Sequence, residues 1–247
     1  MTESKVPEVT LLFWVIKIAA TTLGETGGDA VSMSMGLGYL VATGLFAAVF
    51  LVAVYAQVRA TRFHPSLYWT TIVATTTVGT TLADFADRSL GIGYAGGSAL
   101  LAALLMASLA AWHWSLGSIS VNTVRSARAE GFYWMTIMFS QTLGTALGDW
   151  TADTAGYGYT GAAILFSGLL GVIVLAYLFT KISRTALFWG AFILTRPLGA
   201  VVGDFLDKPV ASGGLALSRY SASLALVVFM LACIVVFRER AARPAGQ

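Results

Sequence analysis

Long apolar runs alternate with short polar stretches along the whole chain. A run of about 20 apolar residues is long enough to cross a bilayer as a helix. The pattern predicts eight such helices and therefore an all-α polytopic membrane protein, with residues 1–247 forming a single transmembrane domain. The runs place the helices at residues 9–31, 37–58, 66–87, 93–116, 131–152, 158–180, 186–206 and 215–237.

The composition supports this class. Of the 247 residues, 57% are hydrophobic and only 11% are charged, whereas soluble domains carry about 25% charged residues. A water-soluble globular protein is thereby excluded, and eight spans leave no room for a separate soluble domain. The one cysteine, Cys233, lies in the last apolar run, which excludes a disulfide framework and a thiolate metal site.

Basic residues gather on one side of the predicted membrane. Ten of the fifteen Lys and Arg residues fall near the N-terminus, after the even-numbered helices or near the C-terminus. The positive-inside rule assigns these segments to the cytoplasm, so both termini are expected there and the number of spans is expected to be even. The ten residues are Lys5, Arg59, Arg62, Arg125, Arg128, Lys181, Arg184, Arg238, Arg240 and Arg243.

One pattern recurs four times: a Trp begins each odd helix, a Gly follows ten residues later, and an Asp five residues after that. The repeats cover approximately residues 9–60, 64–116, 129–181 and 184–238. Because each repeat holds two helices, all four point the same way and are related by a pseudo-symmetry axis along the membrane normal. We expect the Trp residues to be interface anchors. The three series are Trp14, Trp69, Trp134 and Trp189; Gly24, Gly79, Gly144 and Gly199; and Asp29, Asp84, Asp149 and Asp204.

Polar residues follow one face of each odd helix at a spacing of four. Charged side chains are costly in lipid, so these faces are expected to look inward, with the four repeat Asp residues forming a ring. Small residues four apart, such as Gly24 and Gly28, let helices approach closely. The four stripes are Lys17, Thr21, Glu25 and Asp29; Thr76, Thr80, Asp84 and Arg88; Gln141, Thr145, Asp149 and Asp153; and Arg196, Ala200, Asp204 and Lys208.

The acids of the repeats are candidate metal ligands. An oxygen-rich, negatively charged cluster suits a hard divalent cation. Thr21, Thr76, Thr80, Gln141 and Thr145 would line the substrate path. Arg196 is expected to neutralise a repeat Asp inside the bundle, and Lys17 to snorkel to the nearby interface. The candidate metal ligands are Glu25, Asp29, Asp84, Asp87, Asp149, Asp153, Asp204 and Asp207.

A purely structural role for these acids is the alternative. The first acid of each repeat falls about 18–21 residues into its helix, close to the outer interface at about 1.5 Å per residue. Such carboxylates can also be solvated loop residues or N-caps of the next helix.

The repeat core resembles a known family. It reads LGTALGD at 143–149 and LGAVVGDFLDKP at 198–209, with the related TTLGETGGD at 21–29 and VGTTLAD at 78–84. In this it resembles a bacterial family built from a repeat of unknown function (domain of unknown function 347), often labelled as uncharacterised membrane-anchored proteins. The resemblance covers nearly the whole chain and implies a four-repeat, multi-pass protein of the bacterial inner membrane.

The second acid of the repeats is irregular. Ser32 stands where repeats two and four have Asp87 and Asp207, and repeat three has its second acid one residue later, at Asp153. These departures predict one or two unequal sites rather than a four-fold site.

Taken together, the residues favour a secondary transporter, with export considered, of a hard divalent cation such as Mn²⁺ or Mg²⁺. Coupling to protons or another cation is expected, since the chain has no Walker-type phosphate loop. We expect no enzyme activity and no resident cofactor, with the metal ion as substrate. The expected partners are the lipid bilayer and this ion, with a homodimer left open and no nucleic acid. The alternatives are a carrier for a small organic cation or zwitterion, an intramembrane aspartyl enzyme, and a structural role.

Overall fold

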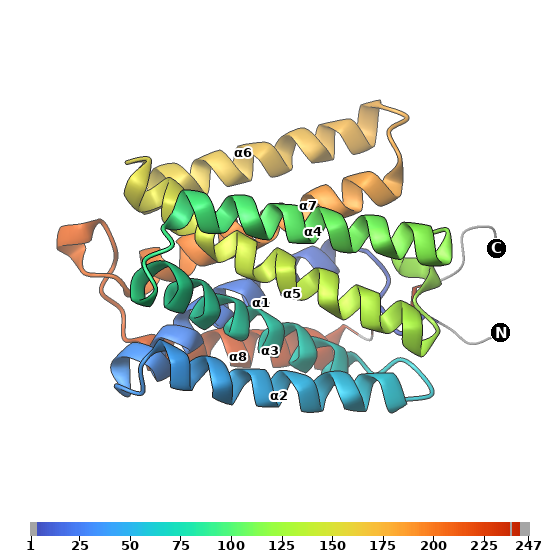
Figure 1. The fold of residues 1–247 in the computed structure, drawn as a ribbon, viewed down its shortest axis with the longest axis horizontal. Coiled ribbons are helices and arrows are strands. Elements are labelled where there is room, and N and C mark those ends of the chain that lie inside the picture. Colours follow the sequence, from blue (N-terminus) through green and yellow to red (C-terminus); the bar gives the residue numbers. More distant parts are fainter. Residues whose placement is uncertain (1–3, 238, 243–247) are drawn as a thin grey trace.

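A computed structural model describes residues 4–237 and 239–242. These residues form eight α-helices that run along the long axis of the molecule (Figure 1). Each begins and ends within a few residues of its predicted bounds. Arg238 and Arg243, counted above among the basic residues, lie outside the described residues. The helices are α1 (Leu11–Asp29), α2 (Tyr39–Arg59), α3 (Pro65–Asp84), α4 (Tyr94–Leu116), α5 (Ala127–Asp149), α6 (Gly158–Phe179), α7 (Arg184–Asp207) and α8 (Arg219–Val236).

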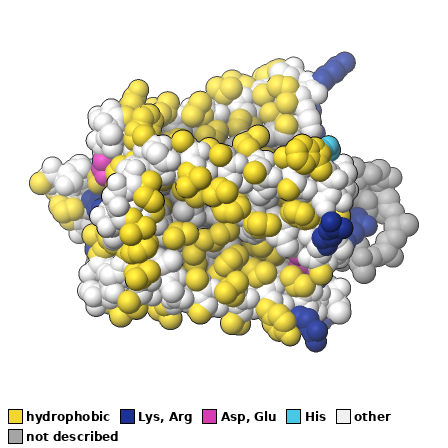
Figure 2. Space-filling view, viewed as in Figure 1, with side chains coloured by type: hydrophobic (Ala, Val, Ile, Leu, Met, Phe, Trp, Pro, Cys, Tyr) yellow, Lys and Arg dark blue, Asp and Glu magenta, His cyan; other side chains and the backbone are white. Residues whose placement is uncertain are grey.

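The surface is that of a membrane protein. Five helices of the described chain, α2, α4, α6, α7 and α8, are long and apolar enough to cross a membrane. Figure 2 shows hydrophobic side chains spread along the visible face, over α2, α4 and α6, while Lys and Arg gather mainly at the end where the termini lie. The other three helices, α1, α3 and α5, carry polar stripes and bury most of their residues.

The odd helices form an inner ring. Helix α1 packs against α3 and α7, and α5 packs against the same two helices, so the four close on themselves. Each even helix packs outside the ring on the inner helix of the following repeat: α2 on α3, α4 on α5, α6 on α7, and α8 on α1. The last pair closes the cycle. The prediction of inner odd helices and outer even helices is confirmed.

Glycine makes the inner ring tight. The Gly ten residues after each Trp lies directly under a polar side chain of the neighbouring inner helix, where a β-carbon would overlap that side chain or its backbone. The repeated Gly is therefore a packing requirement of the ring, as the small-residue spacing predicts. The four pairs are Gly24 with Thr76, Gly79 with Gln141, Gly144 with Arg196, and Gly199 with Thr21.

The inner helices of the first three repeats end in the same way. Directly after the repeat Asp, each continues into one π-helical turn, Ala30–Ser34, Phe85–Ser89 or Trp150–Thr154. Helix α7 instead runs on to Asp207 and is stopped by Pro209, which has no backbone N–H to donate. The fourth repeat thus leaves the ring by a different path from the other three.

Aromatic side chains close one end of the ring, called here the aromatic end. Trp69, Trp134 and Trp189 are buried there, so the prediction that they anchor the protein at the membrane interface is wrong. They pack edge-on against neighbouring rings instead, as Trp189 does against Trp112, with ring centroids 5.8 Å apart and planes at 81°. This end consists of Phe13, Tyr68, Trp69, Trp112, Tyr133, Trp134, Phe188 and Trp189.

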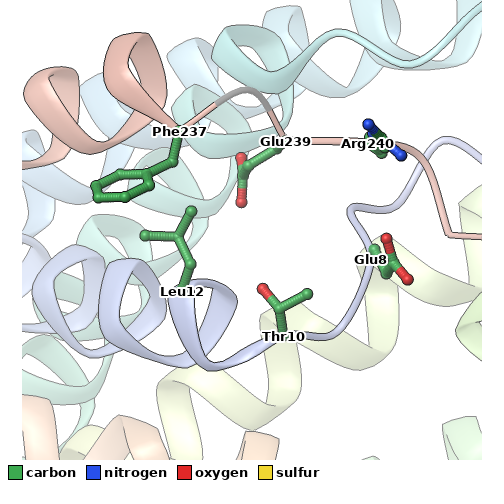
Figure 3. A pocket seen from close by; sticks show the side chains of 6 residues that line it. All are labelled: Glu8, Thr10, Leu12, Phe237, Glu239 and Arg240. Carbon is green, nitrogen blue, oxygen red and sulfur yellow. The ribbon is translucent and has the colours of Figure 1, made fainter.

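The segments before α1 and after α8 cover the aromatic end. Lys5 forms an ion pair with Glu130 (N–O distance 2.6 Å). The indole N–H of Trp69 donates to Glu239 (2.6 Å), and the backbone N–H of Glu8 donates to the carbonyl of Arg240 (2.8 Å). A cavity of about 370 Å³ remains between the two segments (Figure 3), lined by Glu8, Thr10, Leu12, Phe237, Glu239 and Arg240.

Candidate functional site

The polar stripes stack as layers within the inner ring. All sixteen residues of the four layers are buried, and none is more than 3% exposed. The last layer, the aspartate ring, lies at the end opposite the aromatic residues, called here the acidic end. From the aromatic end, the layers are Lys17, Ile72, Ile137 and Phe192; Thr21, Thr76, Gln141 and Arg196; Glu25, Thr80, Thr145 and Ala200; and Asp29, Asp84, Asp149 and Asp204.

Lys208 joins two members of the aspartate ring. Its ammonium nitrogen lies 2.8 Å from Asp29 Oδ2 and 3.0 Å from Asp204 Oδ1. Lys208 follows Asp204 by four residues, at the end of α7, and reaches across to the Asp of α1. One cation therefore serves the carboxylates of two neighbouring repeats.

Arg88 does the same on the other side of the ring. Its guanidinium lies 2.7 Å from Asp84 Oδ1 and 3.5 Å from Asp149 Oδ2. Arg88 also follows its own Asp by four residues and reaches the Asp of the next repeat. Lys208 and Arg88 thus bridge the aspartate ring in two pairs, and the guanidinium of Arg219 lies 3.5 Å from Asp29 Oδ2. The symmetry of the ring is closer to two-fold than to four-fold.

Two overlapping sets of carboxylates are close enough to hold a metal ion. Oxygen atoms of Glu25, Asp149 and Asp204 lie within 4.8 Å of one another, as do those of Asp29, Asp204 and Asp207. Within the first set, Asp149 Oδ1 is buried and has no hydrogen-bond partner in the described part of the chain. A buried carboxylate oxygen without a partner is costly, so a bound cation would stabilise this arrangement.

The other second acids lie apart from these sets. Asp153 is exposed, and Asp87 is half-buried with one oxygen near Gly97 of α4. Both sit in the π-helical turns beyond the aspartate ring. Asp207, which is still part of α7, points inward and accepts a hydrogen bond from Arg219 (2.8 Å). The two sets therefore contain five of the eight predicted ligands and leave out Asp84, Asp87 and Asp153. Asp84 still belongs to the aspartate ring, where Arg88 links it to Asp149.

Arg196 occupies the centre of the inner ring. It is completely buried, and its two terminal nitrogens each donate to Glu25 Oε2 at 3.1 Å. It also donates to the hydroxyls of Thr80 (2.5 Å) and Thr145 (2.6 Å). From α7 it thus contacts α1, α3 and α5. Arg196 is paired with an acid inside the bundle, but the prediction of a repeat Asp as its partner is wrong, because the partner is Glu25.

Lys17 does not reach the membrane interface, and that prediction is wrong. Its ammonium group is fully buried, has no hydrogen-bond partner among the described residues, and lies 4.2 Å from the centre of the Phe192 ring. The aromatic end and the terminal segments lie between it and the surface. Other axial groups also lack hydrogen-bond partners within residues 4–237 and 239–242, namely both amide atoms of Gln141 and the hydroxyl of Thr76. Buried polar groups of this kind are usually satisfied by water or by a ligand.

One axial layer escaped the sequence interpretation. Phe13, Tyr68, Tyr133 and Phe188 are buried one helical turn before the layer of Lys17, and the hydroxyls of Tyr68 and Tyr133 lie 2.6 Å apart. Each immediately precedes a repeat Trp. Extending the spacing of four by one more turn would have identified them.

The fold and the site define a class: a helical membrane protein of four two-helix repeats with a buried ring of carboxylates at one end. Within this class, the chain belongs to the family of the Repeat of Unknown Function (DUF347), whose model matches residues 12–63, 67–118, 132–183 and 187–241. The four matches coincide with the four structural repeats. No curated protein and no solved structure matches the chain. The function must therefore be inferred from the site itself.

Proposed function

We propose that the chain is a secondary transporter of a hard divalent cation such as Mn²⁺ or Mg²⁺. The observation that carries the proposal is the charge of the acidic cluster around the aspartate ring. Six buried acids share four basic side chains, namely Arg88, Arg196, Lys208 and Arg219. With all groups ionised, two negative charges remain, which one divalent cation would balance. The six acids are Glu25, Asp29, Asp84, Asp149, Asp204 and Asp207.

The available ligands favour a hard ion. The ring and the layer beside it offer carboxylate and hydroxyl oxygens, the donors preferred by Mg²⁺, Mn²⁺ and Ca²⁺. The cysteine thiol and the two imidazoles lie elsewhere in the described chain. Cys233 is on α8, His64 precedes α3, and His113 is near the end of α4.

The closed axis favours a carrier over an open pore. Beyond the aspartate ring, a cation would meet the buried Arg196–Glu25 pair, then Lys17, then the aromatic end. Transport would require these layers to rearrange, with protons or another cation occupying the carboxylates on the return. The direction of transport that we consider is export from the cell.

The membrane placement completes the proposal. The chain would cross the bacterial inner membrane eight times, with α1, α3 and α5 shielded from lipid by the outer helices. Lys5, Arg125 and Arg240 belong to the end that holds the termini, which the positive-inside rule assigns to the cytoplasm. The aspartate ring would then face the outside.

Cation binding is tested by the thermal stability of the detergent-purified protein with Mg²⁺, Mn²⁺ or Ca²⁺. A ligand that binds only the folded state stabilises it by about 2.7 kcal/mol at a hundred times its dissociation constant. We expect one hard cation to raise the melting temperature, and Asp149→Asn and Asp204→Asn to abolish the rise. Asp153→Asn is the matched control, because Asp153 is exposed and lies outside both carboxylate sets. A flat response to every cation would contradict the proposal.

Transport itself is tested in liposomes. Purified protein should move the ion that stabilises it, at a rate that depends on an imposed proton or cation gradient. The Asp149→Asn and Asp204→Asn variants should be inactive while Asp153→Asn remains active. If the ion binds but is not transported, the chain would be an ion-binding protein and the proposal of a transporter would be wrong.

A carrier for a small organic cation or zwitterion is the second candidate. The observation in its favour is that the carboxylates already bind ammonium and guanidinium groups, those of Lys208, Arg88 and Arg219. Amines and amino acids in the same thermal assay separate the two candidates. Stabilisation by an amine without any effect of divalent cations would favour the second.

A further inference from the structure

Glu25 belongs to two groups at once. Its Oε2 atom accepts both hydrogen bonds from Arg196. The same carboxylate also offers an oxygen within 4.8 Å of oxygens from Asp149 and Asp204, in the set able to hold a metal ion. Glu25 is therefore the link between the axial ion pair and the aspartate ring.

A guanidinium and a divalent cation would compete for this carboxylate. Glu25 is 3% exposed and Arg196 is fully buried, so water does little to screen the repulsion between two positive groups there. A buried charge without a partner is strongly unfavourable. Neutralising Glu25 with a metal ion thus removes the group that holds Arg196 in place.

We propose that Arg196 is a tethered competitor of the transported cation for Glu25, and that cation binding releases Arg196 from the axis. The inference rests on the proposed function, because it concerns the same cation site. In the structure, the hydroxyls of Thr80 and Thr145 accept hydrogen bonds from the guanidinium. Release of Arg196 would free both hydroxyls. The axial layer then contains oxygen ligands where it previously contained a positive charge.

The repeats support a specialised role for this position. The equivalent residues of the other three repeats are neutral, namely Thr21, Thr76 and Gln141, and all are buried in the same layer. Gly144 of α5 leaves the space that the Arg196 side chain fills. Packing alone is satisfied by a neutral side chain in three of four repeats, so the charge at the fourth has another purpose.

The first test is Arg196→Gln, which places at this position the residue that repeat three carries at Gln141. We expect the Mn²⁺ affinity of the purified protein to rise by about tenfold or more, because the competitor is lost. A merely structural Arg196 would give the opposite result, since damage to the bundle weakens binding. An unchanged or lower affinity in a folded Arg196→Gln protein would overturn the proposal.

A double-mutant cycle shows whether the effect runs through Glu25. Glu25→Gln should lower Mn²⁺ affinity, and adding Arg196→Gln to it should change the affinity no further. Removal of both partners also avoids an unpaired buried charge, so the double variant is the one expected to fold best. If Arg196→Gln still raised affinity in the Glu25→Gln background, competition for Glu25 would be excluded.

A milder pair of variants keeps the proposal testable should Arg196→Gln fail to fold. Thr145→Val removes a hydrogen-bond acceptor of Arg196. Thr142→Val, three residues earlier on α5, removes a hydroxyl whose one hydrogen bond among the described residues goes to the carbonyl of Met138. We expect Thr145→Val to raise the Mn²⁺ affinity by about threefold, because it removes a contact that exists only while Arg196 is bound to Glu25. Thr142→Val should leave the affinity unchanged. Equal affinities in the two variants would contradict the proposal.

The outcomes separate this inference from the proposed function. If Mn²⁺ binding depends on Asp149 and Asp204 but not on Arg196, the cation site stands and the competition is wrong. If no divalent cation binds any variant, the proposed function fails, and this inference fails with it.

Discussion

The two ends of the inner ring use the same helices and the same repeat, but they differ in how the four copies meet. At the aromatic end, like residues pack directly against one another, as Tyr68 does with Tyr133. At the acidic end, the four equivalent Asp residues are separated by Lys208 and Arg88, which the repeats do not share equally. Neutral rings attract one another in many orientations, whereas like charges repel.

This difference explains where the repeats diverge. A four-fold arrangement suits side chains that can be their own partners, and the repeats accordingly keep their aromatic and Gly positions. In a ring of identical carboxylates the like charges repel one another, so the ring needs basic side chains from other positions to offset this repulsion. The basic residues, together with Glu25 and Arg196, break the symmetry at and beside the aspartate ring, which is where we place the function.

The strongest test of the comparison removes a ring from the aromatic end. Trp69→Ala should lower the free energy of unfolding by about 3–5 kcal/mol, because it opens a cavity in the core. Trp69 is 1% exposed, whereas Trp114 on α4 is 84% exposed. Trp114→Ala is the control, with an expected change within about 0.5 kcal/mol in detergent. Similar small losses for both would restore the interface-anchor interpretation.

The next test concerns the close approach of two inner helices at Gly144, on which both ends of the ring depend. Gly144→Ala should destabilise the protein by about 1–3 kcal/mol, because its methyl group would overlap the Arg196 side chain. At Gly44 on α2, apart from its chain neighbours and the adjacent backbone of its own helix, nothing in the described chain lies within 4 Å of the corresponding position. Gly44→Ala should therefore be neutral or stabilising, by up to about 1 kcal/mol. Thermal unfolding in detergent measures both, and equal changes would mean that the ring is not tightly packed at Gly144.

A smaller effect tests direct pairing at the aromatic end. Tyr68→Phe leaves the buried hydroxyl of Tyr133 without its partner and should cost about 1–2 kcal/mol. Tyr68→Phe combined with Tyr133→Phe removes both hydroxyls and should recover most of the loss. Additive losses in unfolding experiments would show that the hydroxyls do not act as a pair.

The smallest effect is a dependence on pH at the cover of the aromatic end. Burial raises the pKa of the Glu239 carboxyl above its ordinary value, although the hydrogen bond from Trp69 lowers the pKa in part. The fold therefore favours protonated Glu239, and this contribution to stability is lost as the pH rises through the folded-state pKa. Glu239→Gln should be more stable than the wild type at neutral pH and equal to it below the ordinary pKa of a glutamate. Parallel stability curves over this range would contradict the assignment.

The sequence predicted the inner and outer helices and the buried Arg196, for physical reasons. Charged residues spaced by four cannot face lipid, and a lone Arg among buried acids must find one of them. By contrast, a Trp near the start of a helix can face lipid or protein, so the burial of Trp69 could not be inferred from its position. The partners of Lys208 and Arg88 depend on how neighbouring helices are rotated and offset, which one helix alone does not reveal.

Asp87 and Asp153 show a further limit of periodicity. The spacing of four assumes an unbroken α-helix, but a π-helical turn comes directly after Asp84 and Asp149. Such a turn holds an extra residue and rotates the later residues around the helix axis. Asp207 is still part of α7, and it is the second acid that lies with the ring.

We propose that the aspartate ring binds one divalent cation, and the stoichiometry of binding tests this most directly. Equilibrium dialysis of the purified protein against Mn²⁺ should give one tightly bound ion per chain. Asp149→Asn or Asp204→Asn should abolish this binding, and Asp153→Asn should retain it. No bound ion in the wild type, or an undiminished ion in the Asp149→Asn and Asp204→Asn proteins, would contradict the claim.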